Sequence, residues 1–165
     1  MRALLTARAL FITLAMVLIS SSAAQAQRIE FIGALSIYAQ QAGSTCNDYN
    51  PIGNRYVIRF RPAGLGENGT DSNLNLFDLD HATGLRLDNA TFDTNWRQVT
   101  ETVVGGRSGT NNQNATYVRF TSQIPSPITS STFQLQIVGE IYNFDFQPGC
   151  WVQFLASGVR RFEDQ

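Results

Sequence analysis

The 165-residue chain contains no lysine, a single histidine and only two cysteines, and these scarcities exclude several kinds of chemistry. Without lysine the chain cannot form a Schiff base, and with two cysteines it cannot build a multi-cysteine zinc site. A mechanism that needs two histidines from one chain is excluded as well. Charged residues make up only 15% of the chain, which differs from a nucleic-acid-binding arm or a disordered polar tail.

The first 26 residues are typical of a secretory signal peptide. Residues 1–8 carry two arginines and no acidic residue, residues 9–19 are almost entirely apolar, and a small-x-small cleavage site follows at 24–26. A membrane-spanning helix needs about 20 apolar residues, more than this segment provides. We therefore expect a signal peptide at 1–26 and a single domain at 27–165, in a protein that is secreted or periplasmic.

Removal of 26 residues from 165 leaves 139, enough for one full core and too few for two domains. Two of the 12 arginines lie in the signal peptide, so ten remain against 13 acidic residues. No basic stripe of the size of a phosphate-backbone footprint is present, and we expect no nucleic-acid partner. No later segment reaches the length of a transmembrane helix, so membrane insertion is not expected.

The two cysteines, Cys46 and Cys150, are expected to form a disulfide in an oxidising compartment. The bond would join the two ends of the domain and close a loop of about 100 residues, which contributes on the order of 4–5 kcal/mol in a chain-entropy treatment. A catalytic thiol would need a nearby base, and the sole histidine has no sequence relation to either cysteine.

Apolar and polar residues alternate with a period of two along the mature chain, which is typical of β-strands with one buried face. Clusters of Asn, Gly, Asp, Ser and Pro separate these segments, as in turns. The sequence predicts an all-β fold, a single antiparallel β-sandwich or small closed barrel of about eight strands. The expected strands cover residues 28–39, 55–61, 73–78, 84–88, 95–104, 116–120, 133–141 and 150–156.

Two local patterns resemble functional motifs without their structural context. Residues 64–69 read G-x-G-x-x-G, but no helix follows to meet a pyrophosphate, so we interpret the segment as a hairpin loop. Asp78 and Asp80 lie near His81, yet their spacing is not that of a calcium-binding loop, and we interpret them as solvated turn residues. A G-x-S-x-G segment, which would indicate a serine hydrolase, is absent as well. We therefore expect no metal ion, no cofactor and no catalytic residue.

Four arginines are the first candidate binding residues. Arg55, Arg59 and Arg61 share the outward face of one strand, and with Arg119 on a neighbouring strand they could bind carboxylate, sulfate or phosphate groups. The alternative is that the arginines pair with acidic residues across the sheet, such as Glu140.

Four aromatic residues, Trp96, Tyr117, Tyr142 and Trp151, are the second candidate. They fall on strands opposite or near the apolar faces, where exposed rings could stack on sugar rings. The alternative is that they belong to the core.

These observations favour an exported, non-catalytic β-domain that binds a glycan, an envelope component or another protein. An eight-stranded outer-membrane barrel is one alternative, although three arginines on one strand face would be costly against lipid. A small barrel that encloses an apolar ligand is a second alternative, and a secreted hydrolase without a short motif is a third.

Overall fold

The computed structural model describes residues 27–46, 50–79, 81–105 and 115–162, so the predicted signal peptide at 1–26 lies outside the described residues. These described residues form eight strands and one short 3-10 helix, η1 (Phe144–Phe146). The strands are β1 (Glu30–Gln40), β2 (Arg55–Arg61), β3 (Ser72–Phe77), β4 (His81–Leu87), β5 (Arg97–Gly105), β6 (Thr116–Ile124), β7 (Gln134–Tyr142) and β8 (Trp151–Arg161). Among the described residues, no helix is long and apolar enough to cross a membrane.

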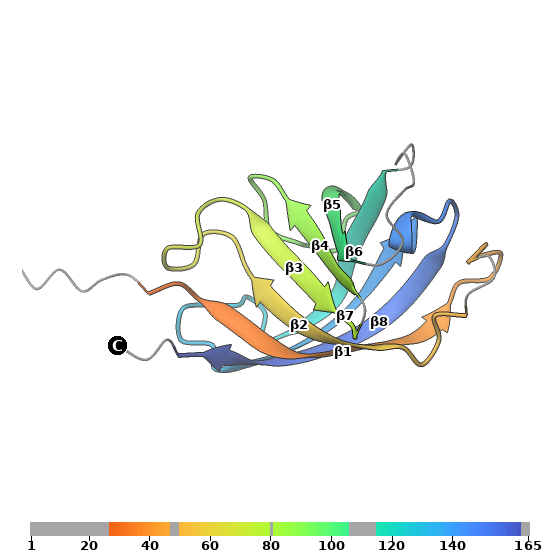
Figure 1. The fold of residues 1–165 in the computed structure, drawn as a ribbon. Coiled ribbons are helices and arrows are strands. Elements are labelled where there is room, and N and C mark those ends of the chain that lie inside the picture. Colours follow the sequence, from red (N-terminus) through yellow and green to blue (C-terminus); the bar gives the residue numbers. More distant parts are fainter. Residues whose placement is uncertain (1–26, 47–49, 80, 106–114, 163–165) are drawn as a thin grey trace, which may run out of the picture.

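The strands form a closed antiparallel barrel (Figure 1). Each strand pairs with the next one along the chain, and β8 returns to pair with β1. This up-and-down order confirms the predicted all-β fold of eight strands and selects the closed barrel over the sandwich. Closure gives both terminal strands a partner, so their backbone groups are hydrogen-bonded within one sheet.

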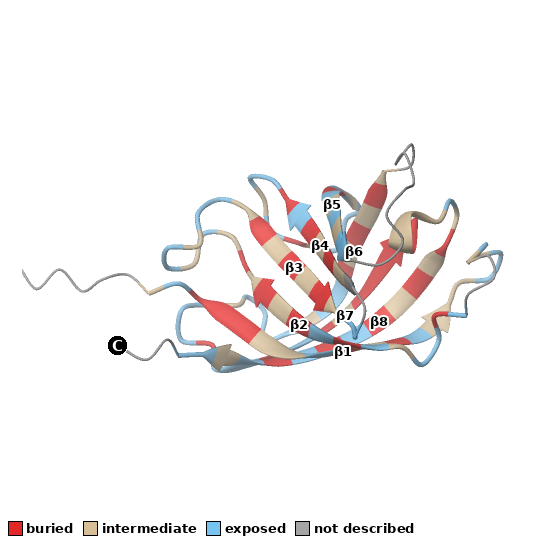
Figure 2. Ribbon diagram, viewed as in Figure 1, coloured by how far each residue is buried: buried red, intermediate tan, exposed pale blue. Residues whose placement is uncertain are grey.

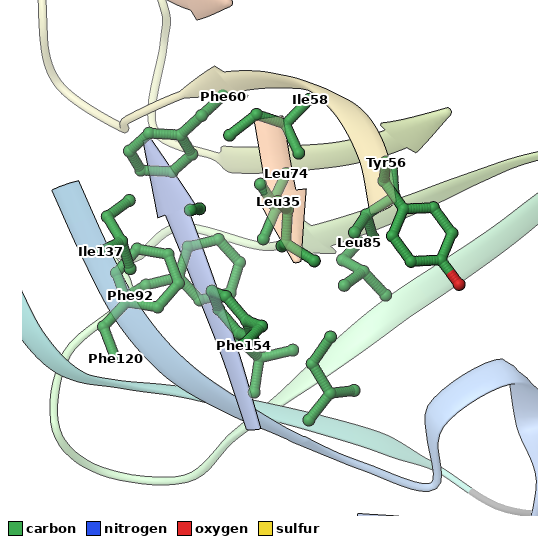
Figure 3. Close-up of a cluster of buried hydrophobic side chains, with 14 of the residues drawn as sticks. Leu35, Tyr56, Ile58, Phe60, Leu74, Leu85, Phe92, Phe120, Ile137 and Phe154 are labelled. Carbon is green, nitrogen blue, oxygen red and sulfur yellow. The ribbon is translucent and has the colours of Figure 1, made fainter. Parts of the chain in front are cut away.

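Side chains alternate between the interior and the outer face of the barrel, as Figure 2 shows by its alternating colours. On β2, Tyr56, Ile58 and Phe60 are buried, whereas Val57 and Arg59 lie on the outer face. The interior is filled by apolar side chains that come from all eight strands and the connecting loops (Figure 3). The alternation that predicted the strands therefore also separates an apolar interior from an outer face that carries most of the polar residues.

Phenylalanine rings fill the centre of the barrel (Figure 3). Phe92 stacks on Phe120 with ring centroids 4.8 Å apart, and Phe120 meets Phe154 edge to face at 6.2 Å. Gly139 lies opposite both Phe120 and Phe154 in the strand register. A β-carbon at Gly139 would lie 2.4 Å from Cζ of Phe154, so the missing side chain leaves room for that ring.

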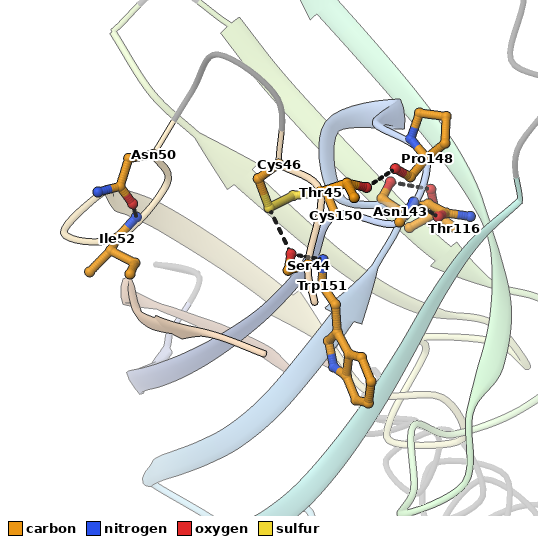
Figure 4. Close-up of a disulfide and its surroundings, with 11 residues drawn as sticks. Ser44, Thr45, Cys46, Asn50, Ile52, Thr116, Asn143, Pro148, Cys150 and Trp151 are labelled. Carbon is orange, nitrogen blue, oxygen red and sulfur yellow. Dashed lines mark hydrogen bonds between the residues drawn. A yellow bond between two sulfur atoms is a disulfide. The ribbon is translucent and has the colours of Figure 1, made fainter. Parts of the chain in front are cut away.

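The disulfide between Cys46 and Cys150 is present, as predicted, and joins residues 104 positions apart (Figure 4). It ties the loop after β1 to the residue that precedes β8. In the same segment, Ser44 Oγ accepts a 2.8 Å hydrogen bond from the backbone N–H of Trp151. The start of β8 is thus fixed covalently and by hydrogen bonds. A disulfide is compatible with an oxidising environment.

Candidate functional site

Two adjacent rows of side chains cross β6, β7 and β8 on the outer face of the barrel. The residues of one row lie directly opposite one another in the register, and so do those of the next row. The aromatic row consists of Tyr117, Tyr142 and Trp151. The polar row consists of Arg119, Glu140 and Gln153. Within each row, strand pairing alone brings together residues that are 9 to 34 positions apart in the sequence.

The aromatic row and Trp96, which directly precedes β5, line a pocket of about 340 Å³ that we call the aromatic pocket. The Trp96 ring lies 5.8 Å from that of Trp151 and 6.5 Å from that of Tyr142, at interplanar angles of 72° and 67°. Tyr142 and Trp151 are 6.2 Å apart at 88°. Three nearly perpendicular rings thus surround one opening. Trp96 and Tyr142 remain 36% and 38% exposed, so the pocket is open to solvent.

A buried carboxylate supports the aromatic pocket from one side. Glu140 is only 5% exposed although it lies on the outer face of β7. Its carboxylate accepts hydrogen bonds from Arg119 Nε at 2.7 Å, Gln153 Nε2 at 3.2 Å and Trp151 Nε1 at 3.3 Å. Because one carboxylate accepts hydrogen bonds both from a pocket ring and from the neighbours of that ring, it fixes the orientation of the ring. The guanidinium carbon of Arg119 also lies 4.7 Å from the centroid of the Trp96 ring.

The side chains of two tryptophans and two tyrosines line the aromatic pocket, and apolar ring atoms form nearly all of its surface. Neither the hydroxyl of Tyr117 nor that of Tyr142 has a hydrogen-bond partner in the part of the chain that the structure describes. Tyrosine and tryptophan present a flat apolar surface together with a polar tip, which suits ligands that combine both characters. The arrangement can therefore stack on one face of a ring-shaped ligand and exchange hydrogen bonds with the groups on its rim.

The four arginines named from the sequence do not form one patch. Arg55, Arg59 and Arg61 lie on β2, whereas Arg119 lies on β6, four strands away in either direction around the ring. The expectation that Arg119 occupies a neighbouring strand is wrong, because the barrel places β2 and β6 on opposite sides. The cross-strand alternative is confirmed for Arg119, which pairs with Glu140. Anion binding by Arg55, Arg59 and Arg61 stays a prediction.

Two of the β2 arginines already have an acidic partner. Glu30, which is 5% exposed, accepts hydrogen bonds from Arg59 Nε at 3.1 Å and Arg61 Nε at 2.7 Å, and Arg161 Nη1 lies 3.5 Å away. Burial alone would raise the pKa of Glu30, but the hydrogen bonds from Arg59 and Arg61 outweigh it and lower the pKa below its ordinary value of 4.5. Three arginines around one carboxylate leave a local excess of positive charge.

A second carboxylate lies on the interior side of the barrel and has no cationic partner among the described residues. Glu101 on β5 accepts a hydrogen bond from Thr116 Oγ1, while its other oxygen, Oε1, is buried with no partner among the described residues. Burial raises the pKa of Glu101 from 4.5 to about 7, and the nearby charge of Asp145 acts in the same direction.

The two motif-like patterns have structural roles. The glycine-rich segment connects β2 to β3, and the Gly64 N–H donates to the Gly69 carbonyl at 2.7 Å, as in the predicted hairpin loop. Gly64 and Gly69 have positive φ angles, a conformation that favours glycine. Asp78 accepts a hydrogen bond from the next backbone N–H at 2.7 Å. Asp80 and the His81 side chain lie outside what the structure describes, and the described residues contain no group of three potential metal ligands.

The sequence indicates the four aromatic residues but not the carboxylate that orients the Trp151 ring. The sequence predicts Glu140 only as an ion-pair partner, because it does not show that Trp151 and Gln153 also face this residue. The strand register supplies that information, and it depends on pairings across the whole barrel. Comparisons with protein-family models, curated proteins and solved structures found no match.

Proposed function

We propose that this protein is an exported, non-catalytic binding domain that recognises a carbohydrate at the aromatic pocket. The observation that carries the proposal is the set of three nearly perpendicular, partly exposed rings held around one opening. Exposed tryptophan and tyrosine side chains leave apolar surface in contact with water, and covering that surface is favourable. A sugar ring has a flat face of C–H groups to cover it and hydroxyl groups that can exchange hydrogen bonds with the hydroxyls of Tyr117 and Tyr142.

The charge at the site favours an uncharged ligand over an organic cation. Perpendicular aromatic rings also suit a quaternary ammonium group. Here, however, the Arg119 guanidinium already lies over the Trp96 ring, and Glu140 is hydrogen-bonded to that same guanidinium. A ligand cation in the aromatic pocket would approach a like charge whose counter-ion is already engaged. A neutral sugar meets no such repulsion.

The distribution of apolar and charged side chains between the interior and the outer face supports a ligand that binds on the outside of the barrel. Its interior is packed with apolar side chains, among them Phe31, Phe120 and Phe154, which are at most 3% exposed. A domain that encloses its ligand needs open interior space instead. An outer-membrane barrel has an apolar outer band, whereas Arg59 and Arg119 lie on the outer face of this one. Export is supported by the signal-like segment at 1–26 and by the disulfide.

A glycan array probed with the mature, disulfide-bonded domain tests the proposal, followed by calorimetric titration of the best-bound short oligosaccharide. We expect Trp151→Ala to weaken its binding about 30-fold, which corresponds to the roughly 2 kcal/mol typical of a central aromatic contact. Phe162→Ala is the matched control, because Phe162 is a 57% exposed aromatic residue just beyond the opposite end of β8. No binding to any glycan, or equal binding by the Trp151→Ala protein, would refute the proposal.

A further inference from the structure

A second, larger depression lies on the same outer face as the aromatic pocket. It has a volume of about 680 Å³ and is bordered by β1, β7, β8, the end of β6 and the first residue of the loop that follows β6. We call it the β7–β8 groove; its outward-facing lining includes Ile32, Ile124, Gln134, Gln136, Ser157 and Val159. None of the residues that line it is charged.

The groove and the aromatic pocket are parts of one ladder of paired residues. The β7–β8 register runs without a shift, so its outward pairs follow one another in a single series. From the pocket to the groove these pairs are Tyr142–Trp151, Glu140–Gln153, Val138–Leu155, Gln136–Ser157 and Gln134–Val159. Because a strand advances about 3.3 Å per residue, Trp151 and Ser157 are roughly 20 Å apart along β8.

The chemistry of this series alternates between apolar surface and neutral hydrogen-bonding groups. An aromatic pair is followed by a polar pair, the aliphatic pair Val138–Leu155, and then the amide and hydroxyl of Gln136 and Ser157. The only charge in the series, Glu140, is buried and paired with Arg119. A ligand that lies along it meets apolar patches and amide or hydroxyl groups, and no free charge.

We infer that the ligand is an extended, uncharged oligosaccharide, one end of which lies in the aromatic pocket while the rest follows β7 and β8 into the β7–β8 groove. This inference rests on the proposed function, because it takes the aromatic pocket as the point of attachment. A linear chain of neutral sugars repeats C–H faces and hydroxyl groups along its length, as the series of pairs does. An acidic polysaccharide would place carboxylate or sulfate groups where the groove offers no cation.

The chain-length dependence of binding tests the inference. Neutral cello-, xylo- and chito-oligosaccharides of two to six units are titrated into the mature domain, with polygalacturonate as the acidic comparison. We expect the six-unit form of the preferred sugar to bind at least about tenfold more tightly than its two-unit form, since the groove adds hydrogen bonds to the longer chain only.

Two variants assign the gain to the groove. Ser157→Arg places a long side chain in its centre, and we expect the six-unit sugar to lose about tenfold in affinity while the two-unit sugar is unaffected. Thr100→Arg adds the same charge at an exposed position on the outer face of β5 and serves as the matched control. Trp151→Ala is expected to weaken both sugars, because it removes the shared attachment point.

The possible failures are distinguishable. Binding of the two-unit sugar with no gain for the six-unit sugar overturns the inference and leaves the proposed function standing. A preference for polygalacturonate overturns the inference alone, because it is still binding of a carbohydrate. Absence of binding to polygalacturonate and to the neutral sugars of every length overturns both. If light scattering shows that the wild-type protein is a dimer that Ser157→Arg converts to a monomer, the groove is an interface between copies of the chain and the inference is overturned.

Discussion

The carboxyl group of Glu101 is expected to make the stability of the barrel fall as the pH rises through 7. The Glu101 side chain lies on the interior side of β5, and its Oε1 atom is buried without a partner among the described residues. Burial raises the pKa of the Glu101 carboxyl from 4.5 to about 7. The folded protein therefore holds this proton up to about pH 7, whereas the unfolded chain releases it near pH 4.5. Since the folded state binds more protons in this interval, its stability is greatest at the acidic end.

The size of the effect follows from the interval. The pKa of Glu101 is 4.5 in the unfolded chain and about 7 in the folded protein. This difference corresponds to at most about 3 kcal/mol of folding free energy at 25 °C. The free energy of unfolding is expected to fall by that order between pH 4.5 and pH 8. Glu101→Gln has nearly the same shape, accepts the hydrogen bond from Thr116 Oγ1 and carries no charge, so its stability should lack this component.

Urea unfolding followed by circular dichroism at pH 4.5, 6, 7 and 8 provides the measurement. All other titrating groups are common to both proteins, so their contributions cancel in the difference between Glu101→Gln and the wild type. We expect the variant to gain stability relative to the wild type as the pH rises. A difference that stays the same from pH 4.5 to pH 8 would refute the assignment of a buried, neutral carboxyl at this position.

Three further predictions concern stability. Gly139→Ala should destabilise the barrel by about 1–3 kcal/mol in urea unfolding, because its β-carbon would meet the Phe154 ring; Gly84→Ala, whose nearest neighbour is a side-chain oxygen at 3.1 Å, should cost less. Reduction of the Cys46–Cys150 disulfide should cost about 4–5 kcal/mol, and an unchanged melting temperature after reduction would contradict this. Glu30→Gln should cost on the order of 3 kcal/mol at pH 7, more than Arg59→Ala or Arg61→Ala, because it leaves three arginines without their shared buried carboxylate. Because the pKa of Glu30 is lowered in the folded protein, the stability lost in Glu30→Gln relative to the wild type should shrink as the pH falls below about 4.5.

The sequence predicted the strands well because their alternation reflects a local property, the burial of one face. The interior side chains Tyr56, Ile58 and Phe60 on β2 follow the predicted pattern residue by residue. Strand ends were less predictable. The last strand was expected to end at residue 156, but β8 continues to Arg161, because β1 and β7 pair with it on both sides beyond that point. Residues 157–161 include Ser, Gly and Arg, whose own preferences do not indicate a strand.

The candidate site was less predictable because it depends on which strands are neighbours. The aromatic character of Trp96, Tyr142 and Trp151 is visible in the sequence, whereas their convergence requires the closed ring and its register. Strand order cannot be read from the alternation of apolar and polar residues. For this reason the sequence wrongly predicted that Arg119 lies on a strand next to β2. Choosing the barrel over the sandwich also required the β1–β8 pairing, which joins the two ends of the chain.

Binding at the aromatic pocket is the central claim, and the most direct test compares tyrosine variants with one sugar. The short oligosaccharide selected on the glycan array is titrated into the wild-type protein, Tyr142→Phe and Tyr142→Ala, with near-ultraviolet circular dichroism to confirm that each is folded. We expect Tyr142→Phe, which keeps the ring, to retain most of the affinity and Tyr142→Ala to lose about tenfold or more. Equal affinities in all three folded proteins would contradict carbohydrate stacking at this site.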